Sequence, residues 1–491
     1  MKALLVPALW LLLLGFPSSW LVLRSVGVAL AVAPLLAGLT CALAAMIAVA
    51  THTSLVLWVV VLALALLAGV LVWSPRMHIR LPAWEVGVVA LITTPLLLMA
   101  RVSPWAWDSH SIWWFHAEWF RVGGARATDA MANPLLAFSH PDYPPLTSAT
   151  VATIWRVTGD RPDARVALLV TIVLTWSALV SFGVALLWTL RHATAGRLPV
   201  RLLAAGLAGF AALAATGSAS LYAGAGYVDH QWAAWFAGAA VLLLLAPPDR
   251  DTTILGAVLL AGAMLTKNEA QVAGIGLVVL ATIRHRRRGR VEITIPWIPV
   301  VLSFAWTALA RLLGARSDLL EGGRFGQLLR GNTEVIDRLH PTLVATRDIV
   351  LGVALATVAV NVLGALWCRG VRRRARVGSD LWMWGLLAGY LAALTVTYLI
   401  SPYDIAWHLN SSIGRTMVAP LMILISIMTV WSVLALLPHG AVFATTPGPE
   451  PIDEDDGDDH PREASPHAET GAHPAASVEE IATEVGTRSN T

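Results

Sequence analysis

Long apolar runs recur along most of the chain, and they restrict its fold more than any other feature. The protein has 491 residues, of which 57% are hydrophobic and only 13% are charged. An α-helix needs about 20 apolar residues to cross a bilayer, and many runs have close to that length. We therefore expect an all-α polytopic membrane protein, a bundle of about thirteen transmembrane helices.

The expected spans begin close to the first residue. They are 4–23, 26–50, 54–73, 83–101, 165–190, 202–221, 231–247, 252–266, 270–283, 295–313, 344–367, 381–400 and 416–437. The first run resembles a signal peptide, but it lacks a small-x-small cleavage site, so we interpret it as a retained helix. Both cysteines, Cys41 and Cys368, lie in apolar runs and predict no disulfide framework.

Arginines mark every second connection between the expected spans. They are Arg76 and Arg80, then Arg191, Arg197 and Arg201, then those of 284–290, and finally those of 369–376. The positive-inside rule assigns these connections to the cytoplasm. The connections that intervene between these, 102–164, 222–230, 267–269, 314–343 and 401–415, should then face the exterior. We expect a multi-pass protein of the plasma membrane with an outward-facing active site.

Three regions follow from this pattern. Residues 1–80 would be additional N-terminal transmembrane helices, and 81–438 a catalytic membrane domain with the long outer loop 102–164. Residues 439–491 include the acidic run Pro451–His460, which has no apolar periodicity and cannot bury a core. We expect this tail to be disordered and cytoplasmic.

Polar side chains collect at the outer ends of the expected spans. Ionisable residues at or inside a membrane are costly and mark functional sites. Because all of these residues fall on one side of the membrane, we expect them to line a single cavity. The candidates are Asp108, His110, His140, Asp142, Tyr143, Asp229, His230, Lys267, Glu269, Asp404, His408 and Arg415.

Carboxylates beside cations suit the transfer of a group from an anionic lipid headgroup. A carboxylate can act as a general base on an acceptor hydroxyl, while lysine and arginine hold phosphate. Ile112, Phe115 and Trp119 are spaced as one helical face, which predicts a short helix over 109–121 lying flat on the bilayer. Nearby tryptophans suit the membrane interface; they are Trp105, Trp107, Trp113, Trp114 and Trp119.

Several motifs together resemble one enzyme family. Asp108 follows an early span, and His140-Pro141-Asp142-Tyr143-Pro144-Pro145-Leu146 forms a turn in the same outer loop. With L-T-K-N-E (Leu265–Glu269) and D-I-A-W-H-L (Asp404–Leu409), they resemble the GT-C membrane glycosyltransferases over about residues 83–420. That family includes protein O-mannosyltransferases and the lipid A aminoarabinose transferase. The chain departs from its commoner Asp-Glu pair, because Ser109 follows Asp108, and from its usual start, because it has extra apolar runs before residue 80.

The resemblance implies a sugar donor carried on polyprenyl phosphate, with Asp108 as the catalytic carboxylate of an inverting transfer. We expect Asp142 to assist catalysis and Lys267 and Arg415 to bind the donor phosphate. The acceptor would be an envelope glycan, a lipid or a protein, and membrane lipid but no nucleic acid would be a partner. We assign no metal ligands and no certain cofactor, and a divalent cation stays open because the histidines lack tight metal spacing.

Plainer interpretations stay open beside these. Asp108 is a favoured type of helix N-cap, and Asp142 lies among prolines as a turn residue would. Lys267 could extend to the interface from a helix end, and Arg415 could be a topological anchor. A transporter or a lipid-linked-sugar flippase would also have many spans, but should show internal repeats and polar residues near the midplane. A non-catalytic scaffold would not need clustered carboxylates and cations.

Overall fold

The computed structural model describes residues 2–73, 77, 79–98, 106–191, 198–215, 224–286, 289–316, 324–367 and 380–436. These residues form helices and turns, and no strand occurs among them, so the all-α prediction is confirmed. The described residues all belong to one compact unit. The expected acidic tail 439–491, Trp105 and the arginines of 369–376 lie outside the described residues.

Eight helices in the described part are long and apolar enough to cross a membrane, the pattern of a multi-pass membrane protein. They lie at Val6–Leu23, Val26–Thr51, Leu55–Val72, Ala164–Arg191, Arg290–Leu312, Thr333–Gly364, Leu381–Ile400 and Ile405–Ala435. The other expected spans form shorter or more polar helices; for example, Pro95 begins a new four-residue helix after Thr93. The count of thirteen therefore stays a prediction.

The N-terminal helices pack into the body of the unit. Helix α2 lies among α1, α3, α8 and α9, and its alanine-rich sequence lets these neighbours approach closely. Ser177 of α9 donates to the α2 carbonyl of Ala31 at 2.6 Å, which ties the two helices together. The elements of this part are α1 (Lys2–Leu23), α2 (Val26–Thr51), α3 (Leu55–Trp73), α4 (Ala83–Thr93), α5 (Pro95–Leu98) and α9 (Ala164–Arg191).

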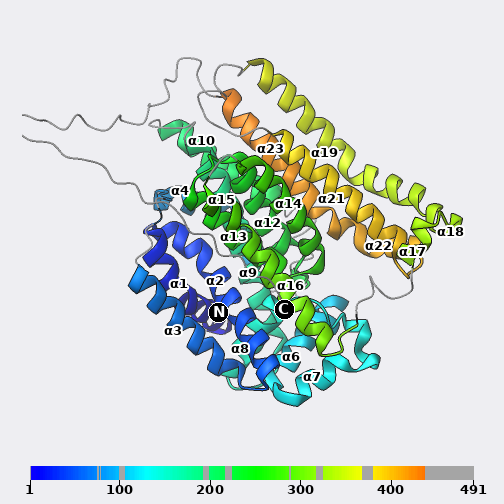
Figure 1. The fold of residues 1–491 in the computed structure, drawn as a ribbon. Helices are drawn as coiled ribbons and strands as arrows, with labels where there is room; N and C mark the ends of the chain where they lie inside the picture. Colours follow the sequence, from blue (N-terminus) through cyan, green and yellow to red (C-terminus); the bar gives the residue numbers. More distant parts are fainter. Residues whose placement is uncertain are drawn as a thin grey trace, which may run out of the picture. The chain divides into compact units, whose positions relative to one another are not determined.

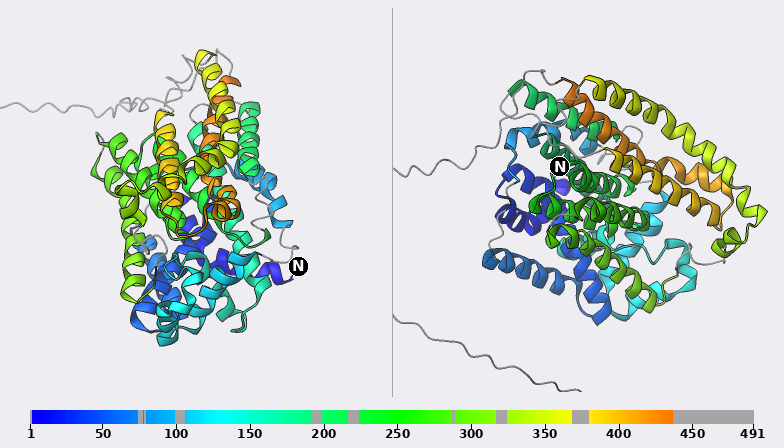
Figure 2. Two further views of the ribbon diagram at one scale, coloured as in Figure 1. Left: turned by 90° about the vertical axis from the view of Figure 1, so that its right-hand side faces the viewer. Right: turned by 45° about the horizontal axis from the view of Figure 1, so that its top comes forward.

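A central group of helices separates the N-terminal helices from the C-terminal ones (Figures 1 and 2). Helix α12 contacts α9, α13 and α23, and every residue of α12 is buried. The central elements are α10 (Leu198–Ala215), α12 (Asp229–Ala240), its π-helical extension η4 (Val241–Leu245), α13 (Arg250–Met264), α14 (Asn268–His285), α15 (Arg290–Thr294) and α16 (Trp297–Leu312).

The C-terminal helices form the opposite flank. Helices α19 and α23 pack side by side, as Figure 1 shows in yellow and orange. Much of α19 is exposed and apolar, including Leu355 and Leu363, which suits contact with lipid. The elements here are α17 (Arg324–Leu329), α18 (Thr333–Ile336), α19 (Leu339–Trp367), α21 (Leu381–Ile400), α22 (Ile405–Thr416) and α23 (Val418–Leu436).

The described part of the expected outer loop 102–164 is mostly helical rather than irregular. It contains η2 (Ser109–Trp113), α6 (Trp114–Val122), α7 (Gly124–Ala132), η3 (Pro134–Ser139) and α8 (Leu146–Val157). The predicted helix over 109–121 is present as η2 and α6, but its tryptophans do not lie at a free surface. Trp113, Trp114 and Trp119 are buried because α6 packs against α8, whereas Trp107 is 67% exposed.

Helices α13 and α14 form a hairpin that turns at Leu265–Lys267. Helix α14 has 18 residues and therefore extends about 27 Å from Asn268 to His285. The turn therefore lies about 27 Å from the far end of α14.

Candidate active site

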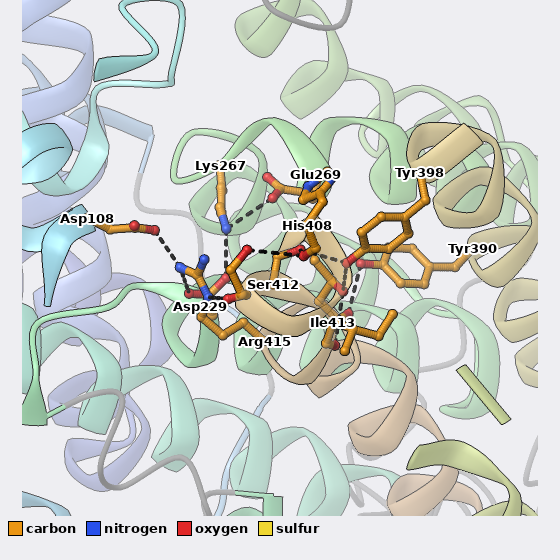
Figure 3. Close-up of polar contacts among 12 residues, drawn as sticks. Asp108, Asp229, Lys267, Glu269, Tyr390, Tyr398, His408, Ser412, Ile413 and Arg415 are labelled. Carbon is orange, nitrogen blue, oxygen red and sulfur yellow. Dashed lines mark hydrogen bonds and ion pairs between the residues drawn. The ribbon is translucent and has the colours of Figure 1, made fainter. Parts of the chain in front are cut away.

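Five charged side chains from four parts of the sequence meet in one network, which we name the charge cluster: Asp108, Asp229, Lys267, Glu269 and Arg415 (Figure 3). Lys267 Nζ lies 2.7 Å from Asp229 Oδ1 and 3.0 Å from Glu269 Oε1. Arg415 Nη1 lies 2.5 Å from Asp108 Oδ2 and 3.8 Å from Asp229 Oδ2. Asp229 therefore joins the two cations.

Asp108 is held at the start of η2 by its neighbour. The Ser109 hydroxyl donates to the carbonyl of Ala225 at 2.5 Å, which fixes η2 against the turn before α12. Gly226 in this turn has a φ of +94°, and a Cβ there would lie 2.4 Å from Ser109 Oγ. Only glycine suits both the left-handed backbone and this close approach.

Asp229 and Lys267 form the buried half of the charge cluster. Their side chains are only 2% and 6% exposed, and they lie at the N-terminal ends of α12 and α14. Burial alone lowers the pKa of Lys267, but the carboxylates of Asp229 and Glu269 outweigh it and hold that pKa above its ordinary value. Lys267 therefore stays charged at neutral pH.

Arg415 is presented by α22 on the accessible side of the cluster. Its guanidinium lies 4.4 Å from the centre of the Tyr227 ring, a cation–π contact. The hydroxyl of Tyr398 bonds with Ser412 Oγ at 2.9 Å and with Thr416 Oγ1 at 3.1 Å, which orients this end of α22. Figure 3 shows Asp108 and Arg415 pointing toward each other from separate elements.

The His-Pro-Asp-Tyr-Pro-Pro turn docks on the hairpin of α13 and α14. The amide of Leu146 donates to the carbonyl of Leu265 at 2.9 Å. Asn268 Nδ2 donates to Asp142 Oδ2, also at 2.9 Å, and the Tyr143 ring stacks on that of His140 at 4.9 Å. The turn thereby brings Asp142 and Tyr143 beside the charge cluster.

Two adjoining cavities open at this end of the bundle. The larger has a volume of about 370 Å³ and is lined by four members of the charge cluster, Asp108, Lys267, Glu269 and Arg415. The smaller has a volume of about 140 Å³ and is lined by Asp142 and Asn268. They share the walls formed by His140, Tyr143, Glu269, Leu394, Thr397, Tyr403 and His408.

Three predicted site residues do not belong to the charge cluster. His110 is exposed and contacts the Trp114 ring edge-on at 4.6 Å. His230 is buried, and neither ring nitrogen has a hydrogen-bond partner in the described part of the chain. Asp404 is exposed and caps α22, where its side chain accepts from the amide of Trp407 at 2.9 Å.

Two of the plainer interpretations are contradicted by the geometry. The side chain of Asp108 makes no capping hydrogen bond to η2 and instead pairs with Arg415. Lys267 does not extend to a surface, because its ammonium is enclosed between two carboxylates. Among the described residues, no group of three or more His, Cys, Asp or Glu side chains is placed to hold a metal ion.

The sequence pattern did not identify Arg338 as part of this region. Its guanidinium is buried and donates to the carbonyls of Tyr398, Leu399, Ser401 and Tyr403. The turn after α21 that it holds lines both cavities. In the sequence, Arg338 is an arginine near the start of a long apolar helix. This pattern is equally typical of a residue that only sets membrane topology.

We compared the chain with protein-family models, curated proteins and solved structures, and none of them matches it. Its function must therefore be argued from the site.

Proposed function

We propose that the protein is an inverting glycosyltransferase of the plasma membrane that uses a polyprenyl-phosphate sugar as donor. The observation that carries this proposal is the charge cluster, in which two cations and three carboxylates meet beside a cavity of about 370 Å³ at one end of an apolar bundle. A lipid phosphate, a sugar and an acceptor hydroxyl must all meet at such a membrane boundary for this reaction. The proposal includes the GT-C-like bundle of about thirteen spans and the exterior position of the site.

Arg415 and Lys267 are the proposed ligands of the donor phosphate. Both line the larger cavity, and the N-terminal ends of α12 and α14 add partial positive charge at the same level. Cations beside a departing phosphate stabilise the charge that develops on it in the transition state. The positions of Lys267 and Arg415 therefore fit a leaving-group site.

Donor binding must compete with a contact already present. Both cations are paired with carboxylates, so an incoming phosphate has to displace one of them. Asp108 is the carboxylate placed to give way, since its side chain is 16% exposed and pairs with Arg415, whereas Asp229 is 2% exposed and bridges both cations. Displacement frees the Asp108 carboxylate in the same cavity as the bound donor.

The freed carboxylate then acts as general base. Asp108 accepts the proton of an acceptor hydroxyl as that oxygen bonds to the anomeric carbon of the sugar. The bond from the anomeric carbon to the phosphate oxygen breaks, and polyprenyl phosphate leaves with both bonding electrons from the opposite face. Single displacement inverts the anomeric configuration and requires no covalent enzyme intermediate.

The position of the site favours an enzyme over a transporter. A substrate pathway across the membrane would place its binding groups near the midplane. The turn of α13 and α14 that carries Lys267 lies about 27 Å from the far end of α14 instead.

The proposal is tested with purified protein in liposomes supplied with polyprenyl-phosphate mannose. Lys267→Ala and Arg415→Gln should each weaken donor binding about 10- to 100-fold, because a hydrogen bond to a charged group contributes about 1.5–3 kcal/mol. Arg311→Ala is the matched control, an exposed arginine near the end of α16 that lines neither cavity. Unchanged donor affinity in both variants, or translocation of the intact donor without its consumption, would contradict the proposal.

A further inference from the structure

The smaller cavity differs from the larger one in the charge of its walls. Its ionised groups are the carboxylates of Asp142 and Glu269, and no lysine or arginine lines it among the described residues. Lys267 and Arg415 line only the larger cavity. The cations of the larger cavity therefore attract an anionic ligand, whereas the carboxylates of the smaller cavity repel one.

Two polar side chains in the walls shared by the cavities have an atom that is not used within the described part of the protein. Glu269 Oε2 is buried without a hydrogen-bond partner in the described part of the chain, although Oε1 of the same carboxylate contacts Lys267. His408 Nδ1 is likewise buried and without a partner there. Buried polar atoms are costly when left unpaired, so both side chains keep unused hydrogen-bonding capacity beside the cavities.

Much of the remaining wall is apolar or aromatic. Val272 of α14 and Tyr390, Ala393 and Leu394 of α21 line the cavity together with the carboxylates. The volume of about 140 Å³ is that of a small site, on the scale of a single ring rather than an oligosaccharide. A sugar ring combines these properties, with hydroxyl donors at its edge and C–H groups on its faces.

We propose that the smaller cavity is a subsite for one uncharged sugar ring, and that it rejects sugars carrying a carboxylate or a phosphate. This inference rests on the proposed function, since it places the sugar beside the phosphate held in the larger cavity. The carboxylates of Asp142 and Glu269 accept hydrogen bonds from ring hydroxyls and repel an anionic substituent. The ring belongs either to the donor or to the acceptor, and the chemistry of recognition is the same for both.

A pair of substitutions on α21 tests the location of the subsite. Ala393 lines only the smaller cavity, so Ala393→Phe should fill it, while the neighbouring Ala392 is exposed and Ala392→Phe is the matched control. Binding of methyl β-glucoside to purified protein is followed by saturation-transfer NMR. Ala393→Phe should weaken binding at least 10-fold and Ala392→Phe should leave it unchanged, with retained binding of sugar-free polyprenyl phosphate showing that both variants are folded.

A matched pair of ligands tests the charge selectivity. Methyl β-glucuronide differs from methyl β-glucoside only in the carboxylate at C6, and it should bind the parent protein at least 10-fold more weakly. Asp142→Asn should reduce the ratio of glucoside affinity to glucuronide affinity. Asp129→Asn, on the exposed face of α7, should leave this ratio unchanged. Equal binding of the two glycosides, no detectable glucoside binding, or unchanged glucoside binding in Ala393→Phe would each overturn the inference.

Binding of the donor identifies the source of the ring. If polyprenyl-phosphate mannose binds more tightly than polyprenyl phosphate, and Ala393→Phe removes the difference, the subsite holds the donor sugar. If Ala393→Phe leaves donor binding unchanged but abolishes glucoside binding, the subsite holds an acceptor sugar. A failure of the parent protein to bind polyprenyl phosphate would count against the proposed function alone, while the glycoside measurements still decide the subsite.

Discussion

Two aspartates of the charge cluster have different surroundings, and these surroundings assign them different roles. Asp229 is almost fully buried at the N-terminal end of α12 and contacts both cations. An ion pair with so little access to water cannot lose one partner cheaply. Asp108 lies on the wall of the larger cavity with more solvent access and pairs with Arg415. We therefore treat Asp229 as the fixed counter-ion and Asp108 as the reactive carboxylate.

Replacing Asp108 by asparagine should separate binding from catalysis. Asp108→Asn removes the base and should lower turnover by about 10²–10⁴-fold. The same change removes the carboxylate that competes with phosphate for Arg415, so donor binding should tighten by about 10-fold. Titration of polyprenyl phosphate and single-turnover rates measure the two effects, with Asp129→Asn as control. Parental turnover in Asp108→Asn would move the search for the base to Asp142.

Stability at mildly acidic pH should depend on His116. This side chain belongs to α6, is buried, stacks on Trp119 and hydrogen-bonds with Ser139 Oγ at 3.2 Å. Burial, together with the nearby His140, lowers the pKa of His116 to about 3. The unfolded chain takes up this proton near pH 6.5, so the neutral native form loses stability as pH falls below that value, by about 2 kcal/mol at pH 5.

The measurement compares melting temperatures of the parent and His116→Gln at pH 7 and pH 5. Glutamine can still donate to Ser139 but does not titrate, so the variant should lose less stability on acidification. Equal losses in the two proteins would show that other groups, such as His140, set the acid sensitivity.

At the scale of elements, Arg338 links three helices to the cavity walls. It immediately precedes α19 and donates hydrogen bonds to carbonyls at the C-terminal end of α21 and in the turn before α22. The last carbonyls of a helix lack partners within it, and a cation is favoured at that end. Arg324 adds a second bond to the carbonyl of Ser401 at 2.9 Å. The outer segment of α17–α19 thus acts as a support for Ser401 and Tyr403.

Arg338→Lys should therefore disturb the cavity walls, although Arg338 itself lines neither cavity. A lysine keeps the charge but cannot reach carbonyls on both sides of the turn, so we expect about 1–3 kcal/mol lower stability and weaker methyl β-glucoside binding. Arg347→Gln, an exposed arginine on the same helix, is the control. Unchanged glycoside binding in a destabilised Arg338→Lys would limit Arg338 to a structural role.

The apolar runs predicted the all-helical class, because a membrane imposes length and hydrophobicity on each span independently of its neighbours, whereas eight described helices, not thirteen, are long and apolar enough to cross one. The same reasoning failed for Trp113 and Trp119, since a tryptophan suits an interface and a protein interior equally well. The pairing of Asp108 with Arg415 crosses 307 positions of sequence and depends on the tertiary fold that brings the two side chains together. Asp404 was grouped with the site residues, but only the structure separates a capping carboxylate from one that lines a cavity.

At the scale of the whole molecule, the charged ends of many elements lie at one end of the bundle. The N-terminal end of α14, the C-terminal end of α21 and the start of α22 border the two cavities. Asp229, at the N-terminal end of α12, contacts two cations that line the larger one. Arg284 and His285, by contrast, lie at the opposite end of α14. This separation agrees with the alternation of arginine-rich connections in the sequence, and we use it to propose that the cavities face the exterior.

That orientation is tested by labelling introduced cysteines in intact cells with an impermeant thiol reagent. Ala125 in α7 and Gly289 before α15 are both exposed, and they belong to connections that we expect on opposite sides of the membrane. The native Cys41 is buried, and Cys368→Ser removes the other native thiol. Ala125→Cys should be labelled from outside and Gly289→Cys only after the membrane is made permeable. The reverse pattern would place the charge cluster in the cytoplasm, where a donor sugar exposed on the outer leaflet could not reach Arg415.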